Sequence, residues 1–263
     1  MNLDLKNKIA VITGGSVGIG LAVAKALAQE GVHLAICARD EERLQAVTRD
    51  IEKEYGVKVI GVKADVSKAP DIDHFAAVIA EHFEKVDILI NNAGTGSSEK
   101  IMDAPDEKWY YYWDLHVMAA IRTAKTIVPL MKKNGGVIIN SASIAATQPM
   151  WYEPIYNVTK IALVMLSKCL ANELITHHIR VNSISPGLIL TPDWVKTAKI
   201  LSPEKNISWE EYLDQVAKEN NPLGRFASPE ELANFYVFLC SSRADFCIGS
   251  NYYVDGGQLK VIL

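Results

Sequence analysis

A tyrosine and a lysine four residues apart, Tyr156 and Lys160, are the first pair in this sequence whose types and spacing point to chemistry. On a helix, residues four positions apart lie on the same face, one turn from each other. A neighbouring ammonium favours the phenolate and lowers the phenol pKa from its ordinary value of about 10. Such a phenol can transfer a proton near neutral pH. Solvated helix faces also carry this pattern, so its meaning depends on the rest of the chain.

A glycine-rich turn follows the first apolar run of the chain. The run Ile9–Thr13 is typical of a strand that is buried on both faces. Directly after it come Gly14, Gly15, Ser16, Val17, Gly18, Ile19 and Gly20. Glycines at this spacing let a pyrophosphate approach the backbone at a helix N-terminus, where free N–H groups favour anions. The sequence therefore predicts a dinucleotide here, with a tight turn that binds no ligand as the alternative.

Arg39 stands at the end of the second expected strand, which closes Ile36-Cys37-Ala38-Arg39-Asp40. In dinucleotide-binding folds a carboxylate at this place holds the ribose of NAD, whereas an arginine accommodates the 2′-phosphate of NADP. This favours NADP, with NAD as the alternative. Val17 supplies no second positive charge, and Arg39 could instead form a surface ion pair with Asp40 or Glu42.

Short apolar runs alternate with longer helical stretches along the whole sequence. Strands are expected at residues 9–13, 32–38, 57–63, 87–90, 136–141, 179–184 and 252–254, and helices from the glycine turn to about 30 and at 41–55, 70–83, 106–131, about 156–176 and 229–239. This rhythm predicts an α/β fold with helices on both faces of a doubly wound, Rossmann-type parallel sheet of about seven strands. We expect one domain spanning 1–263, with residues 188–220 as a substrate lid within it.

Composition and charge exclude several classes of partner. The net charge is −4, so no basic surface indicates binding to nucleic acid or to an anionic membrane. The four cysteines have no metal-ligand spacing, and no metal site is expected. The sequence shows no signal peptide and no apolar run of about 18 residues that could span a bilayer. A cytoplasmic protein acting on a small molecule is the resulting expectation.

With the glycine turn, Tyr156 and Lys160 in place, the chain resembles the short-chain dehydrogenase/reductase family over nearly its whole length. Further segments match the family in order: Asp65-Val66, Asn91-Asn92-Ala93-Gly94, Arg180-Val181-Asn182, Pro186-Gly187 with Thr191, and Asp255-Gly256-Gly257. Asn221 to Arg225 and Ser228 to Glu231 resemble the branch of the 3-oxoacyl-carrier-protein reductases and their relatives. That branch includes enzymes of polyols, sugars, steroids and small ketones, so it leaves the substrate open.

The resemblance implies hydride transfer between a nicotinamide cofactor and a carbonyl or secondary alcohol. Ser143, thirteen residues before Tyr156, would hydrogen-bond the substrate oxygen. Tyr156 would donate or remove the proton, and Lys160 would lower its pKa and hold the nicotinamide ribose. The cofactor residues implied are Gly14, Ser16, Gly18, Ile19, Gly20, Arg39, Asp65, Val66, Asn92, Ala93, Gly94, Tyr156, Lys160, Pro186, Gly187, Ile189 and Thr191.

His116 is a departure from the family pattern. Relatives usually carry an asparagine there, which helps to hold a water that links the lysine to solvent. A histidine can also donate and accept hydrogen bonds, and it can add a pH dependence of its own. We therefore expect His116 to belong to the catalytic group; a histidine that only fills space against the following helix is the alternative.

Large apolar and aromatic side chains near the expected site indicate a partly apolar substrate. Trp151 and Tyr152 precede Tyr156, and Trp194 lies in the expected lid, so we predict that these residues contact the substrate together with Ser143. They could equally pack the lid on the body. The aromatic run Tyr110-Tyr111-Tyr112-Trp113 covers the whole circumference of a helix, so some of it faces outward.

The family commonly forms dimers through its fourth and fifth helices, which are residues 106–131 and the Tyr156 helix in this chain. Exposed aromatic residues suit such an interface. We therefore expect a homo-oligomer, and the resemblance points to a homotetramer. Two alternative functions stay open: an NAD-dependent alcohol or polyol dehydrogenase, and a catalytically silent NAD(P)-binding sensor or scaffold.

Overall fold

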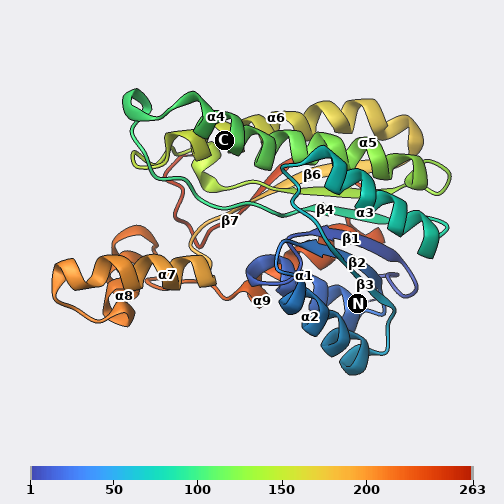
Figure 1. Cartoon of the computed structure of the whole chain (residues 1–263), viewed down its shortest axis with the longest axis horizontal. Helices are drawn as coiled ribbons and strands as arrows, with labels where there is room; N and C mark the ends of the chain where they lie inside the picture. Colours follow the sequence, from blue (N-terminus) through green and yellow to red (C-terminus); the bar gives the residue numbers. More distant parts are fainter. Residues whose placement is uncertain (1, 262–263) are drawn as a thin grey trace.

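The structure is a computed structural model that describes residues 2–261 of the chain. In those residues, seven parallel strands form one sheet in the order β3-β2-β1-β4-β5-β6-β7 (Figure 1). Their bounds are Ile9–Thr13 for β1, His33–Ala38 for β2, Val59–Lys63 for β3, Ile88–Asn91 for β4, Gly136–Ser141 for β5, Ile179–Pro186 for β6 and Asn251–Val254 for β7. The seven expected strands are confirmed, with ends that differ by at most two residues.

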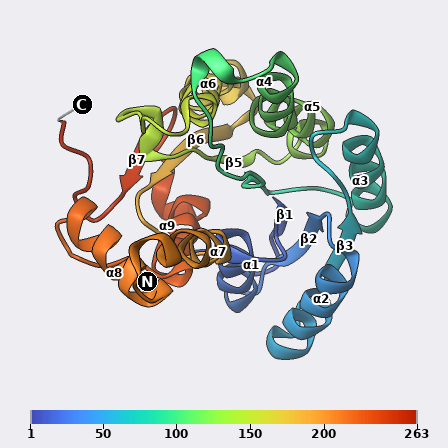
Figure 2. The same cartoon turned by 60° about the vertical axis from the view of Figure 1, so that its left-hand side comes forward.

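Helices cover both faces of the sheet (Figure 2). One layer contains α1 (Gly18–Gln29), α2 (Glu41–Tyr55) and α9 (Pro229–Cys240); the other contains α3 (Ala69–His82), α4 (Asp106–Trp113), α5 (Ala119–Met131) and α6 (Pro154–Leu174). Short 3-10 turns occur at Ile101–Asp103, Ile144–Ala146, Ile175–His177, Ser202–Lys205 and Ser242–Ala244. The predicted Rossmann-type, doubly wound fold is therefore confirmed.

Alternate strand residues enter two separate cores, which explains why the strands read as continuous apolar runs. Ala10 and Ile12 of β1 belong to the core beneath α1 and α9, whereas Val11 between them belongs to the core beneath α3 and α5. All three are fully buried. A strand with helices on both faces needs an apolar residue at every position.

The expected helix at 106–131 is interrupted in its middle. Residues Asp114–Met118 form a π-turn between α4 and α5, in which the Ala119 N–H donates to the Asp114 carbonyl five residues earlier. A π-turn inserts about one extra residue into a helix, and apolar periodicity does not reveal it. The expectation of one continuous helix was wrong at this point, and the interruption contains His116.

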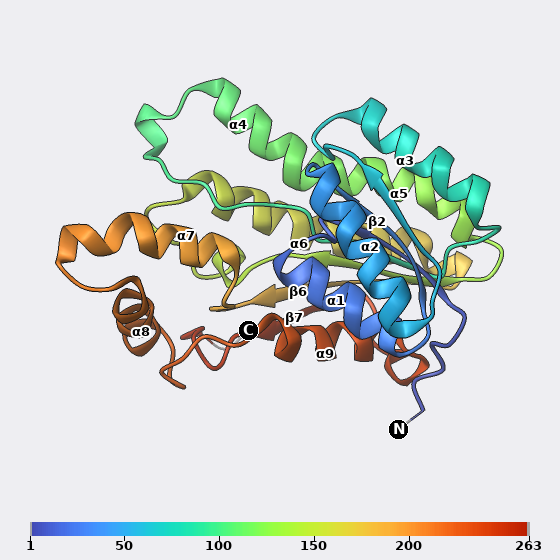
Figure 3. The same ribbon diagram turned by 60° about the horizontal axis from the view of Figure 1, so that its bottom comes forward.

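Residues 188–220, expected as a lid, form two helices at one end of the molecule. These are α7 (Pro192–Leu201) and α8 (Trp209–Asn220), which project from the sheet (Figures 1 and 3). Helix α8 begins with a capping box in which Ser208 and Glu211 satisfy each other's backbone N–H groups.

No helix in residues 2–261 has the length and apolar composition needed to cross a membrane.

A buried polar network joins the central strands to the helices that carry the expected site. The Asn91 amide donates to Asn140 Oδ1 at 2.8 Å, and the Asn140 amide donates to Ser167 Oγ of α6 at 2.8 Å. Thr123 of α5 donates to Asn91 Oδ1 at 2.6 Å. All four side chains are buried. The network therefore fixes β4, β5, α5 and α6 relative to one another.

We predict that Asn140→Ala lowers the free energy of unfolding by about 2–4 kcal/mol, because it leaves the Asn91 amide and the Ser167 hydroxyl without their buried partner. Chemical denaturation monitored by circular dichroism measures this change. Asn220→Ala, which changes an exposed asparagine at the end of α8, is the matched control and should change stability by less than about 0.5 kcal/mol. Equal stability of Asn140→Ala and the wild type would contradict the role given to the network.

Candidate active site

The candidate site lies where the carboxyl ends of the parallel strands meet. The strand order reverses between β1 and β4, and ligands of such sheets bind in the crevice at this reversal. The glycine turn follows β1, Asn92 follows β4, Ser143 follows β5 and Gly187 follows β6. The fold therefore brings these segments, predicted from scattered positions in the sequence, to one edge of the sheet.

The glycine turn fits a pyrophosphate. Helix α1 begins at Gly18 with no side-chain cap, so its first N–H groups have no side-chain acceptor. A Cβ at Gly20 would collide with the Gly14 carbonyl. Gly14 has φ +71°, and a Cβ added to it would stand 3.0 Å from the Ala93 Cα. Only glycine fits these positions, and the uncapped helix end suits an anion.

The segment after β4 is bonded directly to the glycine turn. Thr13 Oγ1 accepts hydrogen bonds from the backbone N–H groups of Asn92 at 3.0 Å and Ala93 at 3.1 Å. The Asn92 amide donates to the Thr13 carbonyl at 3.1 Å. These bonds span the strand-order reversal and hold Asn92, Ala93 and the exposed Gly94 beside the turn. Thr191 also lies close, since a Cβ at Gly18 would stand 3.7 Å from its methyl group.

Arg39 is exposed and forms no ion pair with the described residues. Of the two expected partners, Asp40 pairs with Arg43 at 3.5 Å, and Glu42 forms no ion pair with the described residues. The surface ion pair considered for Arg39 is therefore absent among residues 2–261. The guanidinium stands at the end of β2, free to contact a ligand anion.

The other expected cofactor residues lie on the same edge but contribute in different ways. Asp65 Oδ1 is used within its own turn, where it accepts from the Ser67 hydroxyl at 2.7 Å and from the Ser67 N–H at 3.1 Å. The side chains of Val66 and Ile189 are buried in the protein core. These two residues can therefore face a cofactor only through their backbone. A Cβ at Gly187 would stand 2.8 Å from the Asp255 Cα, so the closing segment packs on this glycine.

Ser143, Tyr156 and Lys160 come together from two elements. Ser143 stands between β5 and the following turn, where its Oγ accepts from the Ala145 N–H at 3.1 Å. Tyr156 and Lys160 lie one turn apart in α6, with the Lys160 ammonium 5.3 Å from the centre of the Tyr156 ring. The ammonium donates to the Ser141 carbonyl at 2.7 Å. The three side chains predicted from the sequence therefore form one cluster.

Burial dominates the protonation of this cluster. Desolvation lowers the pKa of Lys160 to about 8, partly opposed by Glu153. Desolvation and the nearby Glu153 raise the pKa of Tyr156 above its ordinary value, although a hydrogen bond with Ser143 opposes the rise. We expected Lys160 to lower the Tyr156 pKa. The Tyr156 pKa is instead raised here, with burial as the largest cause and with no contribution resolved for Lys160.

His116 lies against the side chains of Tyr156 and Lys160 in α6. Its ring is 5.5 Å from the Tyr156 ring in an edge-to-face arrangement, and its Nδ1 is 2.8 Å from Thr159 Oγ1. The Thr159 hydroxyl donates to the Tyr156 carbonyl, so we assign the proton between the two side chains to His116 Nδ1. Nε2 is then an acceptor; it is buried and has no hydrogen bond of good geometry within the described residues, although the nearby Thr95 backbone favours a protonated ring.

The same surroundings keep His116 neutral. Burial, and then the positive charge of Lys160, lower the pKa of His116 to about 2. A Cβ at Gly94 would stand 3.1 Å from His116 Nε2 and 3.7 Å from the Lys160 ammonium nitrogen, so the three groups meet at Gly94. The pH dependence considered for this histidine therefore lies far below the physiological range.

Glu153 is a site residue that sequence reasoning missed. Burial, and then the charge of Glu99, raise the pKa of the Glu153 carboxyl to about 7. Its charge acts on Tyr156 and on Lys160, and its carboxylate forms no hydrogen bond or ion pair with the described residues. Its place three residues before Tyr156 was the signal in the sequence, but the run Met150-Trp151-Tyr152-Glu153 drew attention to its aromatic members.

The start of α6 is capped by the loop that follows β4. Glu99 Oε1 accepts from the Ile155 N–H at 3.0 Å, and Ser97 Oγ accepts from the Tyr156 N–H at 3.1 Å. A carboxylate at a helix N-terminus satisfies free N–H groups and interacts favourably with the helix dipole. Lys108 pairs with the same carboxylate at 3.0 Å. The position of Tyr156 thus depends on residues nearly sixty positions earlier.

The three aromatic residues expected at the substrate lie in different settings. Trp151 is 87% exposed and packs edge-to-face on Tyr152. Burial raises the pKa of Tyr152 to about 12, with Glu153 adding to the rise. Trp194 packs on Phe226 with ring centres 5.2 Å apart. Tyr152 is therefore the one of the three whose charge acts on Tyr156, whereas Trp151 faces outward and Trp194 packs against Phe226.

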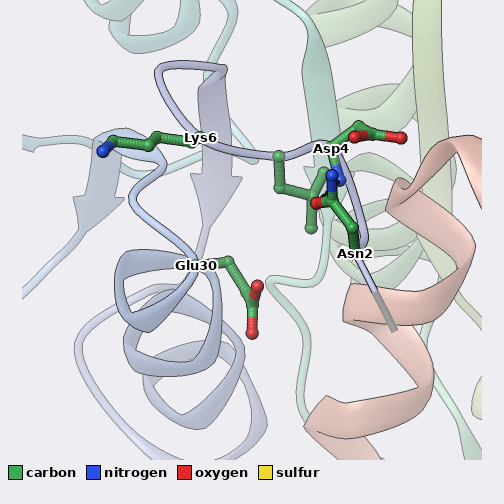
Figure 4. Close-up of a pocket in the computed structure, with 5 residues that line it drawn as sticks. Asn2, Asp4, Lys6 and Glu30 are labelled. Carbon is green, nitrogen blue, oxygen red and sulfur yellow. Dashed lines mark hydrogen bonds between the residues drawn. The ribbon is translucent and has the colours of Figure 1, made fainter.

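Two other features do not belong to the site. A surface hollow lined by Asn2, Asp4, Leu5, Lys6 and Glu30 lies at the start of β1 and the end of α1, the opposite edge of the sheet (Figure 4). In residues 2–261, no group of three or more histidine, cysteine, aspartate or glutamate side chains is arranged to hold a metal ion. The catalytic cluster at the carboxyl edge is the candidate site.

Comparisons with known proteins agree with this geometry. A family model described as enoyl-(acyl carrier protein) reductase matches residues 14–258. The chain is 37% identical over 255 residues to dehydrogenase/reductase SDR family member 4 of Oryctolagus cuniculus, covering 96% of this chain and 94% of the relative. It is 32% identical over 259 residues to the 3-oxoacyl-[acyl-carrier-protein] reductase of Aquifex aeolicus (strain VF5), covering 98% and 100%.

A solved structure is more similar still. The crystal structure of L-sorbose reductase from Gluconobacter frateurii, complexed with NADPH and L-sorbose, superposes with a TM-score of 0.98 at 54% identity and covers 100% of both chains. A short-chain dehydrogenase/reductase from Mycobacterium marinum has a TM-score of 0.86 at 32% identity, with 98% of each chain covered.

We predict that Glu153→Gln changes the pH dependence of stability in a defined direction. The carboxyl titrates at about 7 in the folded chain and at its ordinary 4.5 when unfolded. Between these values the unfolded chain releases the proton first, so Glu153 makes the wild type lose stability as the pH rises. In thermal melting without cofactor between pH 4.5 and 7.5, the stability of Glu153→Gln relative to the wild type should increase as the pH rises. A constant difference across this range would contradict the raised pKa.

Proposed function

Because the chain belongs to the short-chain dehydrogenase/reductase family, a family of NAD(P)-dependent oxidoreductases, we propose that it reduces the ketone of a polyhydroxy compound with NADPH. One observation carries the choice of substrate: the half-buried Glu153 carboxyl is near enough for its charge to act on Tyr156 and Lys160, and it has no hydrogen bond or ion pair with the described residues. A carboxylate oxygen accepts hydrogen bonds from hydroxyl groups, whereas an apolar substrate would cover it without supplying a donor. The sorbose reductase supports the same class, because its structure contains L-sorbose and NADPH.

The reaction needs a proton at the carbonyl oxygen as the carbonyl carbon gains a hydride, which the nicotinamide cofactor supplies when it is bound. The Tyr156 phenol donates this proton. The Ser143 hydroxyl donates a hydrogen bond to the same oxygen and stabilises the negative charge that develops there. Because the phenol pKa is raised in the ligand-free site, Tyr156 starts as the protonated acid that reduction requires. Oxidation of the alcohol would run through the same atoms in reverse.

Lys160 completes the proton-donating group. Its pKa of about 8 leaves the ammonium mostly protonated at neutral pH, so a positive charge stands beside Tyr156 when the phenolate forms. The Ser141 carbonyl orients the ammonium. We propose that the charge of Lys160 acts on the phenolate that forms during turnover, and also holds the ribose hydroxyls of the cofactor.

We propose His116 as a member of this group through its unpaired Nε2. The ring is fixed by its Nδ1–H bond to Thr159, which leaves Nε2 as an acceptor beside Gly94 and Lys160. A water that donates to Nε2 and accepts from the ammonium would satisfy both buried groups. The neutral imidazole thus takes the place in which relatives carry an asparagine, and holds a water through which a proton from solvent can reach Lys160 and Tyr156 after each turnover.

A homo-oligomer that associates through α4, α5 and α6 remains a proposal. Val158, Ile161 and Met165 are 44%, 46% and 63% exposed and lie along one face of α6. Tyr110 and Trp113 of α4 are also exposed, at 66% and 42%. Contiguous exposed apolar side chains of this kind mark association surfaces.

The proposed activity is tested by following nicotinamide absorbance with two classes of substrate. We expect ketohexoses such as L-sorbose to be reduced, and a 3-oxoacyl thioester to be reduced far more slowly, because it offers Glu153 no hydroxyl donor. Tyr156→Phe should reduce kcat by about a hundredfold to ten-thousandfold with NADPH affinity retained, since it removes only the acid. Faster turnover of the thioester would show that the substrate class is wrong, and full activity of Tyr156→Phe would remove it as the proton donor.

Arg39 sets the expected cofactor preference. We predict that Arg39→Leu weakens NADPH binding by about tenfold to a hundredfold and leaves NADH binding nearly unchanged, because it removes a charge-assisted hydrogen bond to the 2′-phosphate. Protein fluorescence titrations with both cofactors measure this. Tighter binding of NADH than NADPH by the wild type would favour the NAD-dependent dehydrogenase instead. A protein that binds cofactor but turns over none of the ketones or alcohols would be the silent sensor.

For His116 we predict opposite results for two substitutions. His116→Asn keeps a donor and an acceptor and should retain most activity. His116→Leu keeps the bulk but cannot hold a water, and should reduce kcat by more than about a hundredfold, or about 2.7 kcal/mol in the barrier. Steady-state kinetics of both variants distinguish a histidine that holds a water from one that only fills space. If His116→Leu were as active as the wild type, the histidine would only fill space.

A further inference from the structure

Arg122 of α5 links two segments that are far apart in the sequence. Its Nη1 donates to the Ser67 carbonyl at 3.0 Å, and its Nη2 is 2.7 Å from Asp114 Oδ1. Ser67 closes the turn after β3, next to the Asp65-Val66 pair. Asp114 is the first residue of the π-turn that carries His116. One guanidinium therefore joins the turn at the cofactor edge to the helix interruption at the catalytic edge.

The ion pair is geometrically tied to the π-turn. Asp114 and Arg122 are eight residues apart. Two turns of a regular α-helix take about 7.2 residues, so residues eight apart are offset by about 80° around the helix axis. A π-turn takes about one residue more than an α-turn, so an interruption within this stretch brings the eighth residue more nearly into line with the first. The contact between Asp114 and Arg122 thus favours the π-turn over a continuous helix.

The π-turn in turn determines where His116 points. Without the extra residue, every side chain after Asp114 would be rotated relative to α4, and His116 would leave its position against Thr159, Gly94 and Lys160. His116 is 3% exposed there, and its Nε2 has no hydrogen bond of good geometry within the described residues. A change that shifts the balance between the π-turn and a continuous helix would therefore move the His116 ring from one position to another.

We infer that Arg122 is a positioning residue that couples the turn at Asp65–Ser67 to His116 through Asp114 and the π-turn. The inference rests on the proposed function, because that function places a cofactor at the turn. A cofactor that orders the turn would fix the Ser67 carbonyl, which strengthens the Arg122 contact and with it the π-turn. Coupling is reciprocal, so a change that removes the Arg122 contact and no longer favours the π-turn must also weaken binding of the cofactor.

The experiment compares Arg122→Met with Arg243→Met. Arg243 is a matched control, because it also contacts one backbone carbonyl and one carboxylate, those of Asn2 and Asp4, at the far edge of the sheet. Full-length protein labelled with ¹³C at histidine Cε1 is titrated with NADPH and followed by NMR, with the His116 signal assigned from His116→Asn. NADPH affinity is measured by fluorescence on the same samples.

In the wild type and in Arg243→Met, we expect one His116 signal that shifts when NADPH binds. In Arg122→Met we expect a displaced or doubled His116 signal in the free protein, and NADPH binding weakened by about fivefold, which lies within the range of typical couplings. If this variant does not fold, Asp114→Asn serves instead, since it weakens the ion pair and leaves the Ser67 contact in place.

A wild-type His116 signal in the folded variant, with unchanged NADPH affinity, would overturn the inference. Equal losses in Arg243→Met would also overturn it, because they would reflect general destabilisation. These readouts need no turnover. An inactive enzyme that nevertheless shows the coupled His116 shift would therefore count against the proposed substrate and not against the role of Arg122.

Discussion

The burial of the Lys160 ammonium is the constraint on which the rest of the site depends. A charge removed from water is expensive unless it is hydrogen-bonded, and here the Ser141 carbonyl provides the direct protein bond. The same desolvation lowers the pKa of Lys160, keeps His116 neutral and raises the pKa values of Tyr156 and Glu153. Burial therefore shifts each pKa toward the form with fewer buried charges, although Lys160, with a pKa of about 8, stays mostly protonated at neutral pH.

The parallel sheet allows so many polar groups to gather in one place, because the loops that follow its strands all lie at one edge. The polar residues at that edge are tied to one another across strands: Thr13 to Asn92, Asn91 to Asn140, and Asn140 to Ser167. These bonds leave little freedom for the loops that carry Ser143 and Gly94. The positions of the site residues are therefore set mainly by the hydrogen-bonded strand ends and less by the loops themselves.

Much of the fold and the outline of the site could be predicted from the sequence. Strands buried on both faces have an unmistakable apolar pattern, and the glycine turn, Ser143, Tyr156 and Lys160 have spacings that short-range geometry explains. The structure brings these residues together, whereas their individual roles stay predictions. The π-turn could not be foreseen, since it depends on a contact between Asp114 and Arg122 and on packing around His116. Glu153, Glu99 and the direction of the Tyr156 pKa were missed for a related reason: burial is set by segments distant in the chain.

The cap of α6 has a consequence for how this protein can change. The first N–H groups of the catalytic helix bond to Ser97 and Glu99, and the Glu99 N–H donates to the Tyr152 carbonyl. The loop after β4 and the loop before α6 are thus hydrogen-bonded to each other and to the start of α6. Transplanting one loop from a relative, without its counterpart, would shift the helix that carries Tyr156. A change in one loop that keeps the position of α6 therefore has to preserve these hydrogen bonds or be matched by a change in the other loop.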